Sequence, residues 1–198
     1  MRPFSYLLAV GLAVAAASAP AKADFEAAAT LLGSSERPTP NNSPGIGYAD
    51  VVYRAVADTL TYTVTFSGLT APALVAHIHV GSIDQAGPVV LPFTHPGPPS
   101  ATSGTFSGTL MNSDIINSAT TGLTDIAQIA AQILAGNAYV NIHSSTYPGG
   151  EIRGQLGAVP EPGSIVLLTL GGAVTVGLAV RRRGGSRAAS ASRTPARP

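Results

Sequence analysis

Leu60-Thr61-Tyr62-Thr63-Val64-Thr65-Phe66 is the stretch that decides the fold class, because apolar and polar side chains alternate along it without interruption. Successive side chains of a β-strand point to opposite faces of the sheet, so this period of two predicts a strand with one buried face. Short strands separated by Gly- and Pro-rich turns predict a mainly β domain, a sandwich or a barrel. Further strands are expected at 45–57, 74–80, 102–110, 138–143 and 151–156.

One segment departs from the β pattern and predicts a single short helix. Asp125 is a residue type suited to a helix N-cap, and isoleucines at 126, 129 and 133 then recur at helical spacing. Gly136 suits the C-terminal stop. We expect this helix to lie across one opening or face of the sheet.

The N-terminus has the features of a secretory signal peptide. Arg2 provides a positive charge, an apolar region runs from Leu7 to Ala17, and Ala21-Lys22-Ala23 offers a small-x-small cleavage site. Residues 1–23 are therefore predicted to be a leader that directs export across the inner membrane, and they are excluded from the fold.

The C-terminal segment pairs an apolar helix with a basic stop. A helix over about 164–180 would be long enough to reach across most of a bilayer, and the basic cluster that follows predicts a cytoplasmic end. A rigid turn precedes the apolar segment at Pro160, Glu161 and Pro162. The basic cluster that follows it consists of Arg181, Arg182 and Arg183.

These three parts, in this order over residues 159–183, resemble a PEP-CTERM sorting signal. The resemblance implies a transient membrane anchor, an exosortase-type membrane protease as partner, and release to the cell surface or extracellular matrix. Residues 184–198 are rich in Ser, Ala, Arg and Pro, which predicts a disordered basic tail.

Charge and cysteine content narrow the function classes. Residues 24–159 carry three arginines and nine acidic residues, a net charge of −6 with histidine neutral, whereas the whole chain carries +1. An acidic domain disfavours a nucleic-acid partner, because phosphate backbones attract basic surfaces. The absence of cysteine excludes disulfides and thiolate chemistry.

Three predicted strands each turn one polar face away from the core. Alternation puts His77 and His79 on one face of their strand, Asn141 and His143 on one face of the next, and Glu151 and Arg153 on one face of the last. If these strands are neighbours, the polar faces converge on one side of one sheet. The candidate metal ligands are His77, His79 and His143, and the candidate binding residues are Asn141, Glu151 and Arg153.

A second resemblance rests on motifs spread over about residues 25–157. Ala76-His77-Ile78-His79-Val80-Gly81, the segment Gly104–Gly108, the segment Ala135–His143 and Tyr147-Pro148-Gly149-Gly150-Glu151 occur in an order that is similar to the CHRD domain. The resemblance implies an immunoglobulin-like or superoxide-dismutase-like β-sandwich over residues 24–158. It carries over no catalytic residues.

Three interpretations of the polar face remain open. Its residues can simply hydrogen-bond within the fold, they can bind an extracellular polysaccharide or protein, or the histidines can hold zinc or copper, with redox activity as a further option. No G-x-S-x-G elbow and no nucleotide-binding glycine loop is present. We therefore expect an exported, non-enzymatic binding or structural protein without a cofactor, and a metal-binding domain as the alternative.

Overall fold

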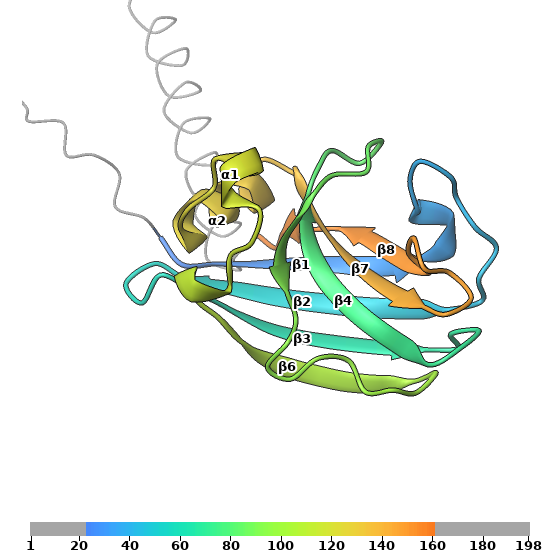
Figure 1. The fold of residues 1–198 in the computed structure, drawn as a ribbon. Helices are drawn as coiled ribbons and strands as arrows, with labels where there is room; N and C mark the ends of the chain where they lie inside the picture. The colour runs from blue at the N-terminus through green and yellow to red at the C-terminus, as the bar shows by residue number, and fades with distance from the viewer. Residues whose placement is uncertain (1–22, 161–198) are drawn as a thin grey trace, which may run out of the picture.

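The computed structural model describes residues 23–160 of the chain (Figure 1). The predicted sorting helix at about 164–180, the basic tail at 184–198 and all but the last residue of the predicted leader lie outside this range. Among residues 23–160, no helix is long and apolar enough to cross a membrane.

The domain is built on one antiparallel sheet. Its strands follow the spatial order β5-β4-β7-β8-β1-β2-β3-β6, and β9 pairs with the free part of β1. The strands are β1 (Phe25–Leu32), β2 (Ile46–Arg54), β3 (Thr59–Ser67), β4 (Ala73–Val80), β5 (Val89–Pro92), β6 (Gly104–Leu110), β7 (Ala138–Ser144), β8 (Ile152–Gln155) and β9 (Gly157–Ala158).

The sheet folds over between β8 and β1, where only Leu32 and Arg153 are paired. The two halves, β5-β4-β7-β8 and β1-β2-β3-β6, then pack against each other (Figure 1). Tyr62 of β3 and Phe93, just after β5, meet with ring centroids 4.4 Å apart and link the two outer ends of the sheet. The prediction of a mainly β domain is confirmed, but the strands form one nearly closed sheet instead of two separate ones. An immunoglobulin-like or superoxide-dismutase-like topology stays a prediction.

The core follows the alternation read from the sequence. All four apolar residues of the β3 pattern are buried, and Thr63 and Thr65 between them are exposed. The side chains that β1 adds to the core include Ala27 and Ala29. Small residues suit this strand, because β8 approaches it so closely that a side chain on Gly154 would collide with the backbone of Thr30.

Strand β7 is buried on both faces, unlike a strand of an open sheet. Its inner face packs Val140 and Ile142 into the core. The loops at 33–45, 81–88 and 145–151 contact residues of its outer face or their neighbours on β8. Polar side chains on this face are therefore removed from water and must find partners within the protein.

Helix α2 (Ile126–Leu134) packs against strands β3, β7 and β9 at one end of the sheet (Figure 1). Asp125 is its N-cap, as predicted, and Gly136 follows its end with a left-handed backbone. The isoleucines at 126, 129 and 133 are buried. A shorter helix, α1 (Ser118–Thr121), and the 3-10 turns η1 (Gly33–Ser35) and η2 (Asn112–Asp114) complete the elements.

We predict that Asp125→Ala lowers the free energy of unfolding by about 1 kcal/mol. The Asp125 carboxylate accepts a hydrogen bond of 2.8 Å from the backbone N–H of Gln128, and alanine leaves that donor without this partner. Asp125→Asn is the matched control, because asparagine is an equally good N-cap. Urea denaturation of the three proteins measures the effect, and equal losses in both variants would contradict the capping role.

Candidate functional site

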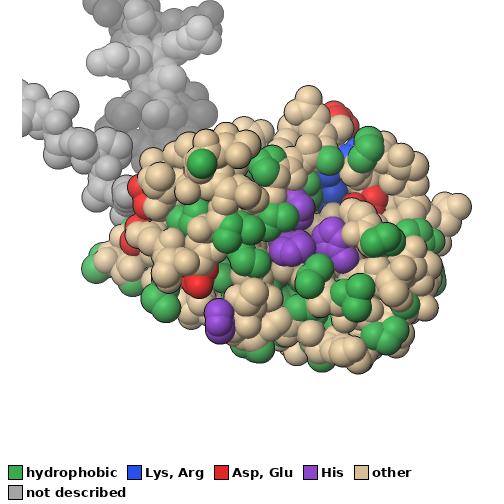
Figure 2. All heavy atoms as spheres, in the orientation of Figure 1, with side chains coloured by type: hydrophobic (Ala, Val, Ile, Leu, Met, Phe, Trp, Pro, Cys, Tyr) green, Lys and Arg blue, Asp and Glu red, His purple; other side chains and the backbone are tan. Residues whose placement is uncertain are grey.

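Strands β4 and β7 bring three histidines together on the outer face of the sheet. In the antiparallel register, His143 of β7 lies opposite Val75, and His77 of β4 lies opposite Asn141. The ring of His143 therefore emerges on the same face as the rings of His77 and His79. The ring centroid of His77 is 5.5 Å from that of His79 and 5.1 Å from that of His143. One ring nitrogen of each residue lies within 4.8 Å of the other two. Histidine side chains group at the surface on this face of the molecule (Figure 2).

The loop at 81–88 fixes the ring of His79. The carbonyl of Gly87 accepts a hydrogen bond of 2.9 Å from His79 Nδ1, and the Gly87 N–H donates to the Tyr139 hydroxyl at 2.9 Å. The Tyr139 ring stacks on His79 with centroids 4.7 Å apart. A side chain on Gly87 would collide with the carbonyl of Val80, so only glycine permits this approach.

The loop at 145–151 fixes the ring of His143 in the same way. The Pro148 carbonyl accepts a hydrogen bond of 2.9 Å from His143 Nδ1. Gly150 takes a positive φ of 131° in this loop, and a side chain there would press on Asn141 and Glu36. Each of the two loops thus supplies one backbone carbonyl to one histidine. Each loop also needs a glycine, Gly87 or Gly150, to take up its conformation.

Three of the four remaining ring nitrogens of this group lack a hydrogen-bond partner among the described residues. Nε2 of His79, Nε2 of His143 and Nδ1 of His77 are buried and have no hydrogen-bond partner among the described residues. Burial lowers the pKa of His77 and of His79 to about 4, with the neighbouring histidines adding to the effect at His77, and burial also lowers the pKa of His143. All three imidazoles are therefore neutral at pH 7 and offer lone pairs.

A second polar group lies beside the histidines. Arg153 is buried with its Cζ 3.5 Å from the centre of the Tyr139 ring, and it donates to the Ser82 carbonyl at 2.9 Å. Asn141 donates from Nδ2 to Glu36 Oε2 at 3.1 Å. Burial raises the pKa of Glu36 to about 7, against the opposing effects of the Asn141 hydrogen bond and of Arg153.

Glu151 lies apart from both groups. Its Oε1 accepts from Ser43 Oγ at 2.7 Å and from the Thr70 N–H at 2.6 Å. Burial works to raise the pKa of this carboxyl, but hydrogen bonds from Ser144, Thr70 and Ser43 outweigh it and lower the pKa. Glu151 therefore ties the loops that carry Ser43 and Thr70 to the end of β7, as a carboxylate.

The structure brings the three candidate metal ligands together, but it buries the candidate binding residues. Asn141, Glu151 and Arg153 are at most 4% exposed and lie beneath loops, so they do not form an open surface. His95, in the exposed loop after β5, hydrogen-bonds to Thr94. Sequence reasoning missed Glu36 and Gly87, which lie in loops where no periodic pattern marks a role.

We predict that Glu36→Gln makes the domain progressively more stable than wild type as pH rises from about 4.5 to about 7. The folded-state pKa of Glu36, about 7, is above its ordinary 4.5, so its stabilising contribution is complete below pH 4.5 and is lost as the pH rises through 7. Glutamine does not titrate and keeps an oxygen for Asn141.

The lowered pKa values of His77 and His79 change the stability of the domain with pH in the direction opposite to that of Glu36. Their pKa values are lowered from 6.5 to about 4, so the stability they contribute above pH 6.5 is lost as the pH falls through 4. The difference in Tm between variant and wild type at each pH removes this shared effect and isolates Glu36. A difference that does not change with pH would refute the raised pKa.

Two family models match the chain. The model of the CHRD domain matches residues 27–156, about two thirds of the chain, and the model of the PEP-CTERM protein-sorting motif matches residues 158–183. No curated protein and no solved structure matches the chain significantly. The sorting motif implies export, transient membrane anchoring and processing by an exosortase, which is a membrane protein. The chain therefore belongs to the CHRD-domain family and carries a PEP-CTERM sorting motif at residues 158–183.

Proposed function

We propose that the chain is an envelope protein in which an exosortase-released CHRD domain acts by binding, at the cell surface or in the extracellular matrix, and not as an enzyme. The observation that carries this proposal is the junction between domain and sorting motif. The matched motif begins at residue 158, and Ala158 is still paired with Ala27 in the sheet. The Val159 N–H donates to the Glu26 carbonyl at 2.8 Å, so the motif starts at the surface of a folded domain.

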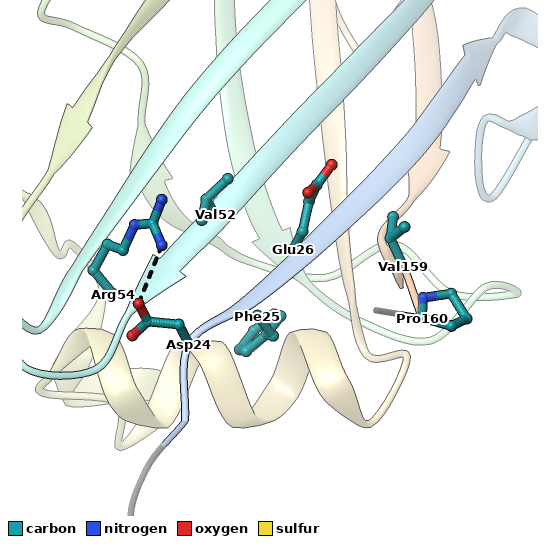
Figure 3. Close-up of a pocket in the computed structure, with 7 residues that line it drawn as sticks. All are labelled: Asp24, Phe25, Glu26, Val52, Arg54, Val159 and Pro160. Carbon is teal, nitrogen blue, oxygen red and sulfur yellow. Dashed lines mark hydrogen bonds and ion pairs between the residues drawn. The ribbon is translucent and has the colours of Figure 1, made fainter. Parts of the chain in front are cut away.

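Both ends of the domain meet at this junction. The lining of a pocket of about 200 Å³ includes Asp24, Phe25 and Glu26 at the start of β1, and Val159 and Pro160 after β9 (Figure 3). Removal of residues 1–23 and cleavage after Pro160 would leave β1 and β9 whole. Processing at both ends is therefore compatible with an intact sheet, as a released domain requires.

The binding role is best supported by the outer face of β1, β2, β3 and β6. A row of side chains crosses all four strands in register: Thr30, Tyr48, Thr65 and Thr105. All four are exposed, and Tyr48 is 51% exposed. This differs from the outer face of β7, which loops cover.

The chemistry of this row suits an extracellular polysaccharide. A shallow pocket of about 290 Å³ includes Thr30, Ile46, Tyr48 and Thr65 in its lining. An exposed tyrosine ring offers a flat apolar surface for a sugar ring, and threonine hydroxyls both donate and accept hydrogen bonds. The Oγ1 atoms of Thr65 and Thr105 are 3.0 Å apart and already hydrogen-bonded, which presents them as a fixed pair.

Sorting is tested with the full-length chain in a bacterium that carries an exosortase. We expect the double variant Pro160→Ala, Pro162→Ala to stay in the membrane fraction at uncleaved mass, whereas the wild type reaches the surface or the medium as a shorter protein. Pro98→Ala with Pro99→Ala, in a loop of the domain, is the matched control. Equal release of all three proteins would overturn the sorting proposal.

Binding is tested by co-sedimentation of the released protein with extracellular polysaccharide from the same bacterium. We expect Tyr48→Ala to weaken binding about fivefold or more, the size of effect typical of an exposed aromatic contact residue. Tyr147→Ala is the matched control, because Tyr147 lies in the loop beside the histidines and not on the face that carries Tyr48. Unchanged binding by Tyr48→Ala, or an equal loss in the control, would exclude this face as the binding surface.

A further inference from the structure

The three histidines play no part in the proposed sorting or in the proposed polysaccharide surface. We propose that they form a transition-metal site, with Nδ1 of His77, Nε2 of His79 and Nε2 of His143 as the protein ligands to zinc or copper. This inference stands independently of the proposed function, since it rests on a different face of the sheet.

The first support is the arrangement of lone pairs. His79 and His143 each point Nδ1 at a backbone carbonyl, which can only accept a hydrogen bond. Nδ1 therefore carries the proton in both rings, and Nε2 carries a lone pair. Both Nε2 atoms are buried without a donor, as is Nδ1 of His77. In the tautomer of His77 that carries its proton on Nε2, Nδ1 is a third acceptor, and three neighbouring acceptors need a positive centre or a set of donors between them.

Hydrogen bonds within the protein do not meet this need. The three nitrogens find no donor among the described residues, and their neighbours on this face do not supply one. Tyr139 directs its hydroxyl to Gly87, and Arg153 directs Nη2 to the carbonyl of Ser82. A single water molecule has two hydrogens and can satisfy two of the nitrogens, whereas one metal ion can accept lone pairs from all three.

The second support is that the rings are already oriented by outer contacts. Histidines that bind metals commonly donate their other ring N–H to a carbonyl or carboxylate, which sets the tautomer and holds the ring. The carbonyls of Gly87 and Pro148 do this for His79 and His143. His77 stands between these two rings, edge-on to both. One ring nitrogen of each histidine lies within 4.8 Å of the other two, and side-chain rotations would bring the ligand nitrogens to the separation of about 3.4 Å that bonds of about 2.0–2.1 Å require.

The ligand chemistry selects the kind of metal. Three neutral imidazoles suit zinc or copper and disfavour calcium and magnesium, which prefer oxygen ligands. No carboxylate joins the three-histidine group among the described residues, since Glu151 and Glu36 bond elsewhere. Three protein ligands leave a fourth position for water or a small anion, as in open zinc sites.

A nearby cation does not occupy the site. Arg153 comes from β8 and His79 from β4, on opposite sides of β7, and both stack on the ring of Tyr139. The aromatic ring therefore lies at the boundary between the guanidinium and the histidines. A small anion in the fourth position would further offset the charge of the ion and of Arg153.

The test uses the full-length chain, purified in detergent without a polyhistidine tag and stripped of metal with a chelator. Isothermal titration with zinc is expected to give one ion per chain with a Kd of about 1 µM or tighter. Cobalt is expected to give the intense visible absorption of a four-coordinate ion, and that spectrum should change on addition of azide. Magnesium should give no heat above the dilution control.

The variants locate the ion. His79→Ala and His143→Ala are each expected to weaken zinc binding by about 100-fold or more, beyond the 10–100-fold effects of losing an outer contact. His95→Ala, which removes the exposed histidine outside the group, should bind as the wild type does. Circular dichroism checks that each variant keeps its β structure.

The wild-type titration keeps the proposal falsifiable even if a variant does not fold. Less than about 0.2 zinc ions per chain in the folded wild type would overturn the site, as would full binding by His79→Ala or a loss caused by His95→Ala alone. None of these outcomes would affect the sorting proposal, which is read from cleavage and fractionation.

Discussion

The antiparallel register between β4 and β7 is the constraint on which the rest of the candidate site depends. It places His77 opposite Asn141 and His143 opposite Val75, so that the histidines of both strands and Asn141 emerge on one face. A shift of one residue would turn these side chains into the core and expose Ile78 and Ile142 in their place. The register is therefore held by the same apolar side chains that form the core, and the histidines inherit their positions from it.

Burial of the outer face of β7 gives the polar groups their character. In an open sheet, His143 and Asn141 would be solvated and unremarkable. Beneath the loops Asn141 is buried and His143 is half-buried, and each polar atom removed from water must be matched within the protein or by something bound to it. Oε1 of Glu151 shows the matched case, with hydrogen bonds from Ser43 and Thr70. The three imidazole nitrogens show the unmatched case, which single atoms such as Glu151 Oε2 and Arg153 Nη1 share. Among the described residues, the histidines are distinguished by being gathered as three potential ligands within 4.8 Å of one another.

Elements with a strong sequence pattern were predicted, and elements with a weak pattern were missed. Strict alternation identified β3, and the capping residue and isoleucine spacing identified α2. Strand β1 was missed, because Phe25-Glu26-Ala27-Ala28-Ala29 is rich in alanine, which has little strand preference, and its small side chains are selected by the close approach of β8. The polar alternation of β4 and β7 placed the histidines on common faces. It could not show that loops cover that face, because burial by a loop leaves no periodic signal in the sequence.

The junction of β9 with β1 has a consequence for how such a domain can be combined with others. The start of β1 and the residue that follows β9 are joined by one hydrogen bond, between Glu26 and Val159. A folding unit whose entry and exit points coincide can be spliced into a surface loop of an unrelated host, or placed in tandem copies, without stretching either partner. The same closeness makes circular permutation feasible, with a short linker across this junction and new ends opened in a distant turn.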